Sequence, residues 1–169
     1  LLDISGRVFG NPIAVMTGAF KTIAATWDFE PNSGVFWELL GLGYLTNDSY
    51  RKLRERGYLD PETLDGKTHV FPADDLNCFD STITAIKQDG ATGFIVLMLC
   101  SNTPMSAGIM QLYEYFVDKL RDYLQPTTSS SEYLRSQFDY FLVDIIEGRI
   151  SSQRDIIERS LVYPPAFVA

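Results

Sequence analysis

The fold depends on the stretch Phe94-Ile95-Val96-Leu97-Met98-Leu99-Cys100, seven apolar residues in succession that follow Gly93. An unbroken run of this kind shows neither the period of two of a half-buried strand nor the 3.6-residue period of an amphipathic helix. Its length and the flanking glycine favour a buried strand, but a core helix accounts for it nearly as well. The assignment of residues 94–100 therefore separates an α+β fold from an all-α fold.

The residues after this run predict two long helices. Thr103-Pro104 places a cap and a proline at a helix start, and apolar residues recur at helical spacing in the segment that follows. Ser129 and Glu132 have the spacing of a capping box and predict a second amphipathic helix. Residues 125–131 join the two helices as a flexible connector, so we expect a C-terminal antiparallel helical hairpin.

Helical patterns also prevail upstream of the apolar run. Asn11-Pro12 has the form of an N-cap followed by proline at the first helical position, and Thr46 and Gly57 have the form of a helix cap and a helix stop. His69-Val70-Phe71 is expected to pair briefly as a strand, after which Pro72 opens another helix. We therefore expect upstream helices at about 12–28, 35–40, 46–57 and 72–90.

Together these elements predict an all-α fold, a bundle-like single domain of six to seven helices over residues 1–169 with the helical hairpin at its C-terminal end. Residues 162–169 are expected to form an extended tail, because Tyr163-Pro164-Pro165 disfavours a helix. The alternative is an α+β fold with a buried strand at 94–100. Because the chain begins with Leu1, we expect it to be a processed product or a part of a longer protein.

The composition predicts a folded, acidic protein. The 169 residues carry a formal charge of −8, the pI is near 4.5, and 46% of the residues are apolar. The negative charge repels nucleic-acid phosphates, and the sequence has no run of about 18 apolar residues that would span a membrane. We expect neither nucleic-acid binding nor a membrane span. The basic cluster is expected to be a solvent-exposed helix face; it consists of Arg51, Lys52, Arg54 and Arg56.

The cysteines and the single histidine narrow the possible chemistry. Cys78 and Cys100 lie in apolar surroundings, which favours reduced, buried thiols and an intracellular location, in the cytoplasm or another reducing compartment. His69 stands alone, so neither a multi-histidine metal site nor a usual zinc site is expected. We expect no metal and no cofactor, although carboxylate sites for magnesium or calcium stay open.

Two short motifs resemble catalytic motifs of known families. Leu99-Cys100-Ser101-Asn102-Thr103 is similar to the Cys-Asn-Thr loop of aspartate and glutamate racemases, which implies a nucleophilic Cys100 beside the amides of a helix start. Asp75-Leu-Asn-Cys-Phe-Asp80 resembles the first catalytic motif of viral RNA-dependent RNA polymerases, in which two aspartates hold magnesium. The chain lacks the Gly-Asp-Asp turn of those polymerases, so we interpret Asp74 and Asp75 as acids that favour a helix start.

Aromatic residues near the C-terminus support the functional expectation. Tyr115, Tyr133 and Tyr140 lie off the main apolar stripes and Phe167 lies in the tail, where they are available to a partner, although a wide core explains the tyrosines equally well. Because no catalytic constellation is evident, we expect a non-catalytic helical interaction or structural subunit of a homo-oligomer or larger assembly. The alternatives are a small enzyme with its site at the Cys100-Ser101-Asn102 loop and a helical carrier of an apolar ligand.

Overall fold

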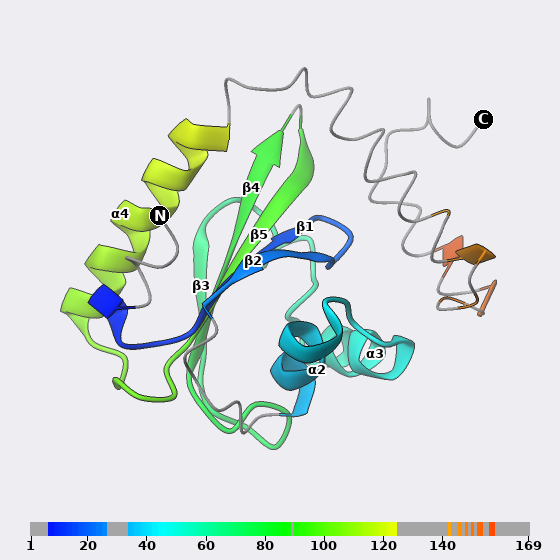
Figure 1. Ribbon diagram of the computed structural model, residues 1–169, viewed down its shortest axis with the longest axis horizontal. Coiled ribbons are helices and arrows are strands. Elements are labelled where there is room, and N and C mark those ends of the chain that lie inside the picture. Colours follow the sequence, from blue (N-terminus) through cyan, green and yellow to red (C-terminus); the bar gives the residue numbers. More distant parts are fainter. Residues whose placement is uncertain are drawn as a thin grey trace.

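The computed structural model describes residues 7–26, 34–88 and 90–124, together with isolated positions between 142 and 157. In this part of the chain, five strands form one antiparallel sheet, and helices pack on both of its faces (Figure 1). The fold is therefore α+β, and the predicted all-α helical bundle is wrong. Residues 94–99 form the central strand of the sheet, which is the alternative that the apolar run left open.

The order of the strands explains the unbroken apolar run. The strands are β1 (Ile13–Thr17), β2 (Thr22–Ala25), β3 (Thr68–Phe71), β4 (Ser81–Gln88) and β5 (Ala91–Leu99). They lie in the order β2-β1-β5-β4-β3, so β5 occupies the middle and pairs with β1 on one side and β4 on the other. A central strand that is covered on both faces buries nearly all its side chains, and alternation between apolar and polar residues is lost.

The helices cover the two faces of the sheet. They are α2 (Gly34–Leu42), α3 (Asn47–Glu55) and α4 (Ala107–Leu124). On one face, Leu97 of β5 belongs to a core cluster with Leu39 of α2 and Leu53 of α3. On the other face, Val96 belongs to a second cluster with Tyr113 of α4. In Figure 1, α2 and α3 accordingly lie on one side of the sheet and α4 on the other.

The predicted helix at 12–28 is wrong, because its described part is a hairpin of β1 and β2. All five residues of β1 are buried, since this strand lies between β2 and β5. The helical spacing of Met16 and Phe20 is therefore a coincidence in a strand covered on both faces and the turn after it. Asn11 does not cap a helix either, because its side chain is buried and bonds to the loop after β5.

The predicted helix at 72–90 is also wrong. Residues 72–80 form a loop in which an oxygen of Asp74 accepts a hydrogen bond from the amide of Asn77 at 2.7 Å, which closes a local turn instead of capping a helix. The next residues, Ser-Thr-Ile-Thr-Ala-Ile, are rich in β-branched side chains and form β4, which pairs with both β3 and β5. Gly90 lies in the turn between β4 and β5, not at a helix end.

The remaining helix and strand predictions within the described residues are confirmed in outline, whereas the predicted burial of Cys78 is wrong, because Cys78 is exposed on the loop at 72–80. The hydroxyl of Thr46 accepts a hydrogen bond from the amide of Ser49 and caps α3, and Gly57 follows the helix with a positive φ of 78°. The short helix α2, the strand at His69–Phe71 and the long helix after residue 104 also lie close to where the sequence places them. The predicted cap at Thr103 is wrong, because α4 begins at Ala107 and the hydroxyl of Ser106 accepts a hydrogen bond from the amide of Ile109 in the first turn. These elements carry strong local signals, namely caps, stops and a helical apolar stripe.

Several predictions fall outside the described residues. These are the connector 125–131, the second helix of the C-terminal hairpin and the extended tail 162–169. Ile150 is described and buried, and Ala19 of the β1–β2 turn packs against it. The extent of the domain stays a prediction. In the part of the chain that the structure describes, no helix is both long enough and apolar enough to cross a membrane.

Candidate functional site

The basic residues of α3 are exposed, and most are paired with carboxylates. Lys52 Nζ lies 2.5 Å from an oxygen of Asp48, and Arg51 pairs with the same aspartate. Arg56 follows the helix and reaches the loop between β3 and β4, where its Nη2 lies 2.5 Å from Oδ1 of Asp75. Because these pairs neutralise the cations, this is the solvent-exposed helix face that the sequence predicted.

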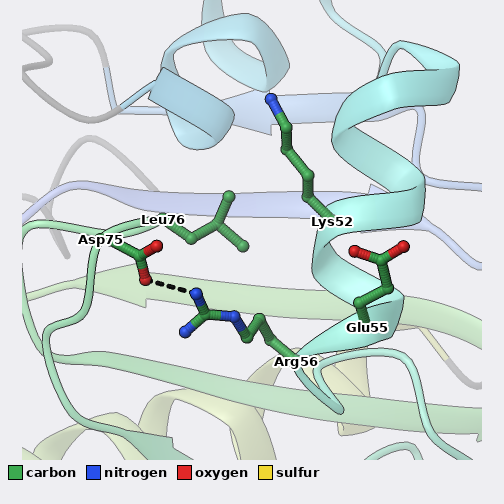
Figure 2. A pocket seen from close by; sticks show the side chains of 5 residues that line it. All are labelled: Lys52, Glu55, Arg56, Asp75 and Leu76. Atoms are coloured by element: carbon green, nitrogen blue, oxygen red, sulfur yellow. Dashed lines mark hydrogen bonds and ion pairs between the residues drawn. The ribbon is translucent and has the colours of Figure 1, made fainter.

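A cavity of about 330 Å³ lies between α3 and the loop at 72–80. Lys52, Glu55 and Arg56 line it from α3 and the turn after it, and Asp75 and Leu76 line it from the loop (Figure 2). Figure 2 shows Arg56 reaching across to Asp75, with Leu76 extending from the loop in the direction of Lys52. The lining therefore contains two basic groups, two acidic groups and one apolar side chain.

Hydrogen bonds within the loop hold its residues against the cavity. Asp74 Oδ1 accepts from the amides of Leu76 and Asn77, at 2.9 and 2.7 Å, and the amide of Asp74 donates to the carbonyl of Asn77. Asp80 Oδ1 accepts from the amide of Ala73 at 2.9 Å and joins the two ends of the loop. Hydrogen bonds within the segment thus hold the loop in a compact turn.

Three buried polar side chains gather in and beside this loop, and we call them the Tyr58 cluster. They are Tyr58, Asn77 and Ser81. Tyr58 is 1% exposed and the other two are 0% exposed. Among the described residues, the hydroxyls of Tyr58 and Ser81 and both polar atoms of the Asn77 side chain have no partner in good hydrogen-bond geometry, although the Ser81 and Asn77 side chains lie close enough to the Tyr58 hydroxyl to act on its pKa through hydrogen bonding. A buried group left in this state costs about 1–3 kcal/mol, and native interiors contain few of them.

None of the three cluster side chains lines the cavity, but Tyr58 lies near Arg56, which does. Its ring stacks on Phe71 of β3 with 3.9 Å between the centroids, and Phe71 pairs with Ser81 across β3 and β4. Burial raises the pKa of the Tyr58 hydroxyl and the charge of Asp74 raises it further, whereas hydrogen bonding by the Ser81 and Asn77 side chains and the charge of Arg56 lower it in part. Arg56 therefore lies near enough to act on Tyr58 while it also lines the cavity.

The loop of Cys100, Ser101 and Asn102 holds its cysteine inside the protein. Cys100 is 8% exposed, and burial, with a smaller contribution from the charge of Asp80, raises its pKa to about 11. Ser101 is half-buried and Asn102 is exposed. The amides of Asn102 and Thr103 both donate to Asn11 Oδ1, at 3.0 and 2.8 Å. The thiol is thus protonated near neutral pH, and the amides expected to assist it are already bonded.

The other side chains that could bind a metal ion or act as a base each form a separate contact within the protein. Asp75 forms the ion pair with Arg56, whereas Asp80 accepts a backbone hydrogen bond within the loop. His69 Nε2 lies 2.9 Å from Asp65 Oδ1, and this bond is the main cause that lowers the pKa of Asp65 to about 2. In the described ranges, no group of three or more His, Cys, Asp and Glu side chains is placed to hold a metal ion.

Of the four predicted interaction residues, Tyr115 lies in the described part of the chain, and Tyr133, Tyr140 and Phe167 lie outside it. Tyr115 is 63% exposed on α4. Two further apolar side chains are exposed on the same side of the helix, because they lie one and about two turns away from it; they are Leu112 and Tyr123. We call these three residues the α4 flank.

The Tyr58 cluster and the role of Asn11 do not follow from any local spacing. The cluster members come from the turn after α3, the loop and the start of β4. The signal that would have helped is the run Ser-Thr-Ile-Thr-Ala-Ile, whose β-branched residues indicate a strand and so place Ser81 beside a partner strand. The sequence matches no model of a known protein family, and no curated protein matches it at a significant level.

Proposed function

We propose that this chain is a non-catalytic domain that binds a small polar molecule at the cavity beside the Tyr58 cluster. The observation that carries the proposal is the side chain of Asn77, which is fully buried and has no partner in good hydrogen-bond geometry among the described residues. A side-chain amide carries two donor hydrogens and a carbonyl oxygen that accepts. The Tyr58 hydroxyl can satisfy only part of this capacity, so a bound molecule or an ordered water would stabilise the buried amide further.

The cavity is large enough to hold a small molecule, although Asn77 itself lies behind its lining. Its volume of about 330 Å³ is at the lower end of the ~300–1,000 Å³ of small-molecule sites and far exceeds the space of one water. Leu76 lines the cavity and also packs against the apolar core, and Asn77 is the next residue in the chain. A rotation of the Leu76 side chain would therefore be a short route from the cavity to the buried amide.

The energetics of the cluster favour a functional role. An apolar core of similar shape would avoid the desolvation of the three polar groups, so the cluster lowers the stability of the unliganded protein. Residues that destabilise a fold are often retained because they take part in binding or catalysis. The charged lining also favours a polar ligand over the apolar ligand of the carrier alternative.

Binding can be tested with a panel of small polar compounds, using thermal unfolding and calorimetric titration. Cys78 is exposed on the same loop, so a fluorophore attached to it gives a third signal. We expect one saturable site, with a stabilisation of ~2.7 kcal/mol when the ligand is at one hundred times its Kd.

Two variants locate the site, and a third is the matched control. Asn77→Leu and Ser81→Ala should abolish or strongly weaken binding. Thr82→Val should leave it unchanged, because Thr82 is equally buried and also lacks a side-chain partner, yet it lies on the sheet face that α4 covers. Binding that persists in both cluster variants contradicts the proposal, and so does the absence of binding by any compound of the panel.

A second candidate function is assembly, with this domain as a structural or interaction subunit. The α4 flank favours it, because three large apolar side chains in a row are exposed to solvent. Leu142 and Ile146 add further exposed apolar side chains near the C-terminus. The two functions use opposite faces of the sheet and are compatible. The enzyme alternative at Cys100 gains no support from a buried thiol with a raised pKa.

A further inference from the structure

Among the described elements, helix α4 forms the outer layer on its face of the sheet (Figure 1). It packs on the sheet through four buried side chains, which are Tyr113, Phe116, Val117 and Leu120. The α4 flank lies beside this buried face, with Leu112 42%, Tyr115 63% and Tyr123 71% exposed. Because these three residues extend over about three turns, the flank is long enough to pack along a second helix.

A straight seam of exposed positions runs along the flank. Its members are separated by three, four and three residues, which is the spacing that meets a partner helix in a two-stranded coiled coil. They are Leu112, Tyr115, Lys119 and Asp122. The remaining flank residue, Tyr123, follows directly and lies at the margin of the seam. Because the spacing is the same in both directions, the seam can pair position by position with an antiparallel copy of itself.

We infer that a second copy of this chain covers the α4 flank, and that the two α4 helices lie antiparallel about a two-fold axis. The inference rests on the assembly function proposed above and specifies its partner and orientation. Lys119 of each copy then lies opposite Tyr115 of the other copy. Leu112 lies opposite Asp122 of the other copy, with the ring of Tyr123 beside it, so the two ends of the flank cover each other.

The charges of the seam favour this orientation over the parallel one. In a parallel pair, Lys119 would face Lys119 of the other copy and Asp122 would face Asp122, and like charges in contact repel. In the antiparallel pair, each ammonium group faces an aromatic ring, whose electron-rich face attracts a cation. Lys119 Nζ already lies 5.6 Å from the centroid of the Tyr115 ring in its own chain, so it points along the seam to where the ring of the other copy arrives.

The ion pairs of α4 can persist in such a dimer. Lys119 Nζ lies 3.5 Å from Asp122 Oδ2 in the same seam, so the aspartate already has a counter-charge where Leu112 of the other copy approaches. Arg121 pairs with Asp118, and neither residue belongs to the seam. The flank is only about 16 Å long. Because a contact of this length buries a small area, we expect a dimer that dissociates on dilution.

Disulfide trapping tests the orientation in the whole chain. Leu112→Cys and Asp122→Cys are each made together with Cys78→Ser, which removes the exposed thiol, while Cys100 stays buried. In the antiparallel dimer, position 112 of one copy lies opposite position 122 of the other. The two copies of position 112 lie about 15 Å apart, which is too far for a disulfide. An equal mixture of the two variants should therefore form cross-linked dimers at least tenfold faster than either variant alone.

Substitutions of Lys119 test the contribution of its charge, with the dimer dissociation constant measured by light scattering across a concentration series. Lys119→Glu should raise the constant at least tenfold, because the face of an aromatic ring repels an anion. Lys119→Arg should keep it within about threefold, since a guanidinium group also stacks on aromatic rings. Arg121→Glu is the matched control. It changes the net charge by the same amount outside the seam, so it should also stay within about threefold.

The outcomes separate this inference from the assembly function. If each cysteine variant alone cross-links as fast as the mixture, the helices are parallel, which overturns the orientation and leaves assembly through the flank. Self-association without cross-linking, or with equal effects of Lys119→Glu and Arg121→Glu, places the contact elsewhere and overturns the inference alone. A natural protein that is monomeric at every concentration contradicts both the assembly function and the inference.

Discussion

The side chain of Asn11 is hydrogen-bonded to the backbone of Thr103 in both directions. Nδ2 of Asn11 donates to the carbonyl of Thr103, and Oδ1 accepts from the amide of the same residue, each at 2.8 Å. The amide of Asn102 donates to the same oxygen at 3.0 Å. One buried side chain thus joins the segment before β1 to the loop that leads from β5 into α4.

Replacement of Asn11 by alanine should strongly destabilise the protein. Three hydrogen bonds are lost and two loop amides lose their acceptor, so we expect the free energy of unfolding to fall by about 3 kcal/mol. Urea denaturation followed by circular dichroism measures the change. Asn102→Ala is the control, because that side chain is exposed, and it should change stability by less than about 0.5 kcal/mol. Equal losses in the two variants would contradict the assigned role of Asn11.

The two cysteines should differ widely in reactivity. Cys78 is exposed, whereas Cys100 is buried and its pKa is raised to about 11. At pH 8 an aromatic disulfide reagent should modify one thiol per chain rapidly, and the second on the order of 100-fold more slowly because little thiolate is present. In Cys78→Ser the fast phase should disappear. A fast phase that persists there would instead support the enzyme alternative at Cys100.

The ion pair between Asp65 and His69 should make stability depend on pH in the acid range. The pKa of Asp65 is lowered to about 2, below the 3.8 of an unperturbed aspartate. A carboxyl with a lower pKa in the folded state stabilises the fold above its unfolded pKa, and this contribution is lost as pH falls through the folded value. The stability difference between the natural protein and Asp65→Asn should therefore be close to its full size at about pH 5 and shrink as the pH falls toward 2. An unchanged difference across this range would refute the assignment.

The α4 flank should control self-association if the chain works as an assembly subunit. We expect light scattering after size-exclusion chromatography to show a mass that rises with concentration. The double variant Tyr115→Ser and Tyr123→Ser should remain a monomer, because it removes the two most exposed aromatic side chains of the flank. Gln111→Ser with Glu114→Ser, on exposed polar positions of the same helix, is the matched control. A natural protein that is monomeric throughout would contradict self-assembly.

The predictions that are confirmed depend on interactions between residues close together in the sequence, and those that fail depend on contacts between residues far apart in the chain. Thr46 and Gly57 bracket α3 through local hydrogen bonding and a positive φ, and α4 has an apolar stripe, so both helices could be predicted. The hairpin of β1 and β2 could not, because its burial depends on pairing with β5, far along the chain. Asp74 shows the same limit, since a turn and a helix cap use the same side-chain bonds.

The candidate site was still harder to predict. Arg56 was recognised as part of a basic cluster, but its partner Asp75 belongs to a loop whose position depends on the pairing of β3 with β4. The sequence pattern predicts a helix at 72–90, and in such a helix Asn77 and Ser81 would not lie next to Tyr58. Only the sheet brings the three together, because Phe71 pairs with Ser81 and stacks on Tyr58.

The central claim is that the Tyr58 cluster is retained for binding and not for folding, and the unfolding free energy of Asn77→Leu tests it most directly. Because the variant removes an unpartnered buried amide, we expect the unliganded protein to be as stable as the natural one, or more stable by about 1–3 kcal/mol, while ligand binding is lost. Ser81→Ala should behave in the same way, and Thr82→Val should keep binding. A loss of more than about 2 kcal/mol in both cluster variants, with Thr82→Val unaffected, would contradict the claim and make the cluster a structural hydrogen-bond network.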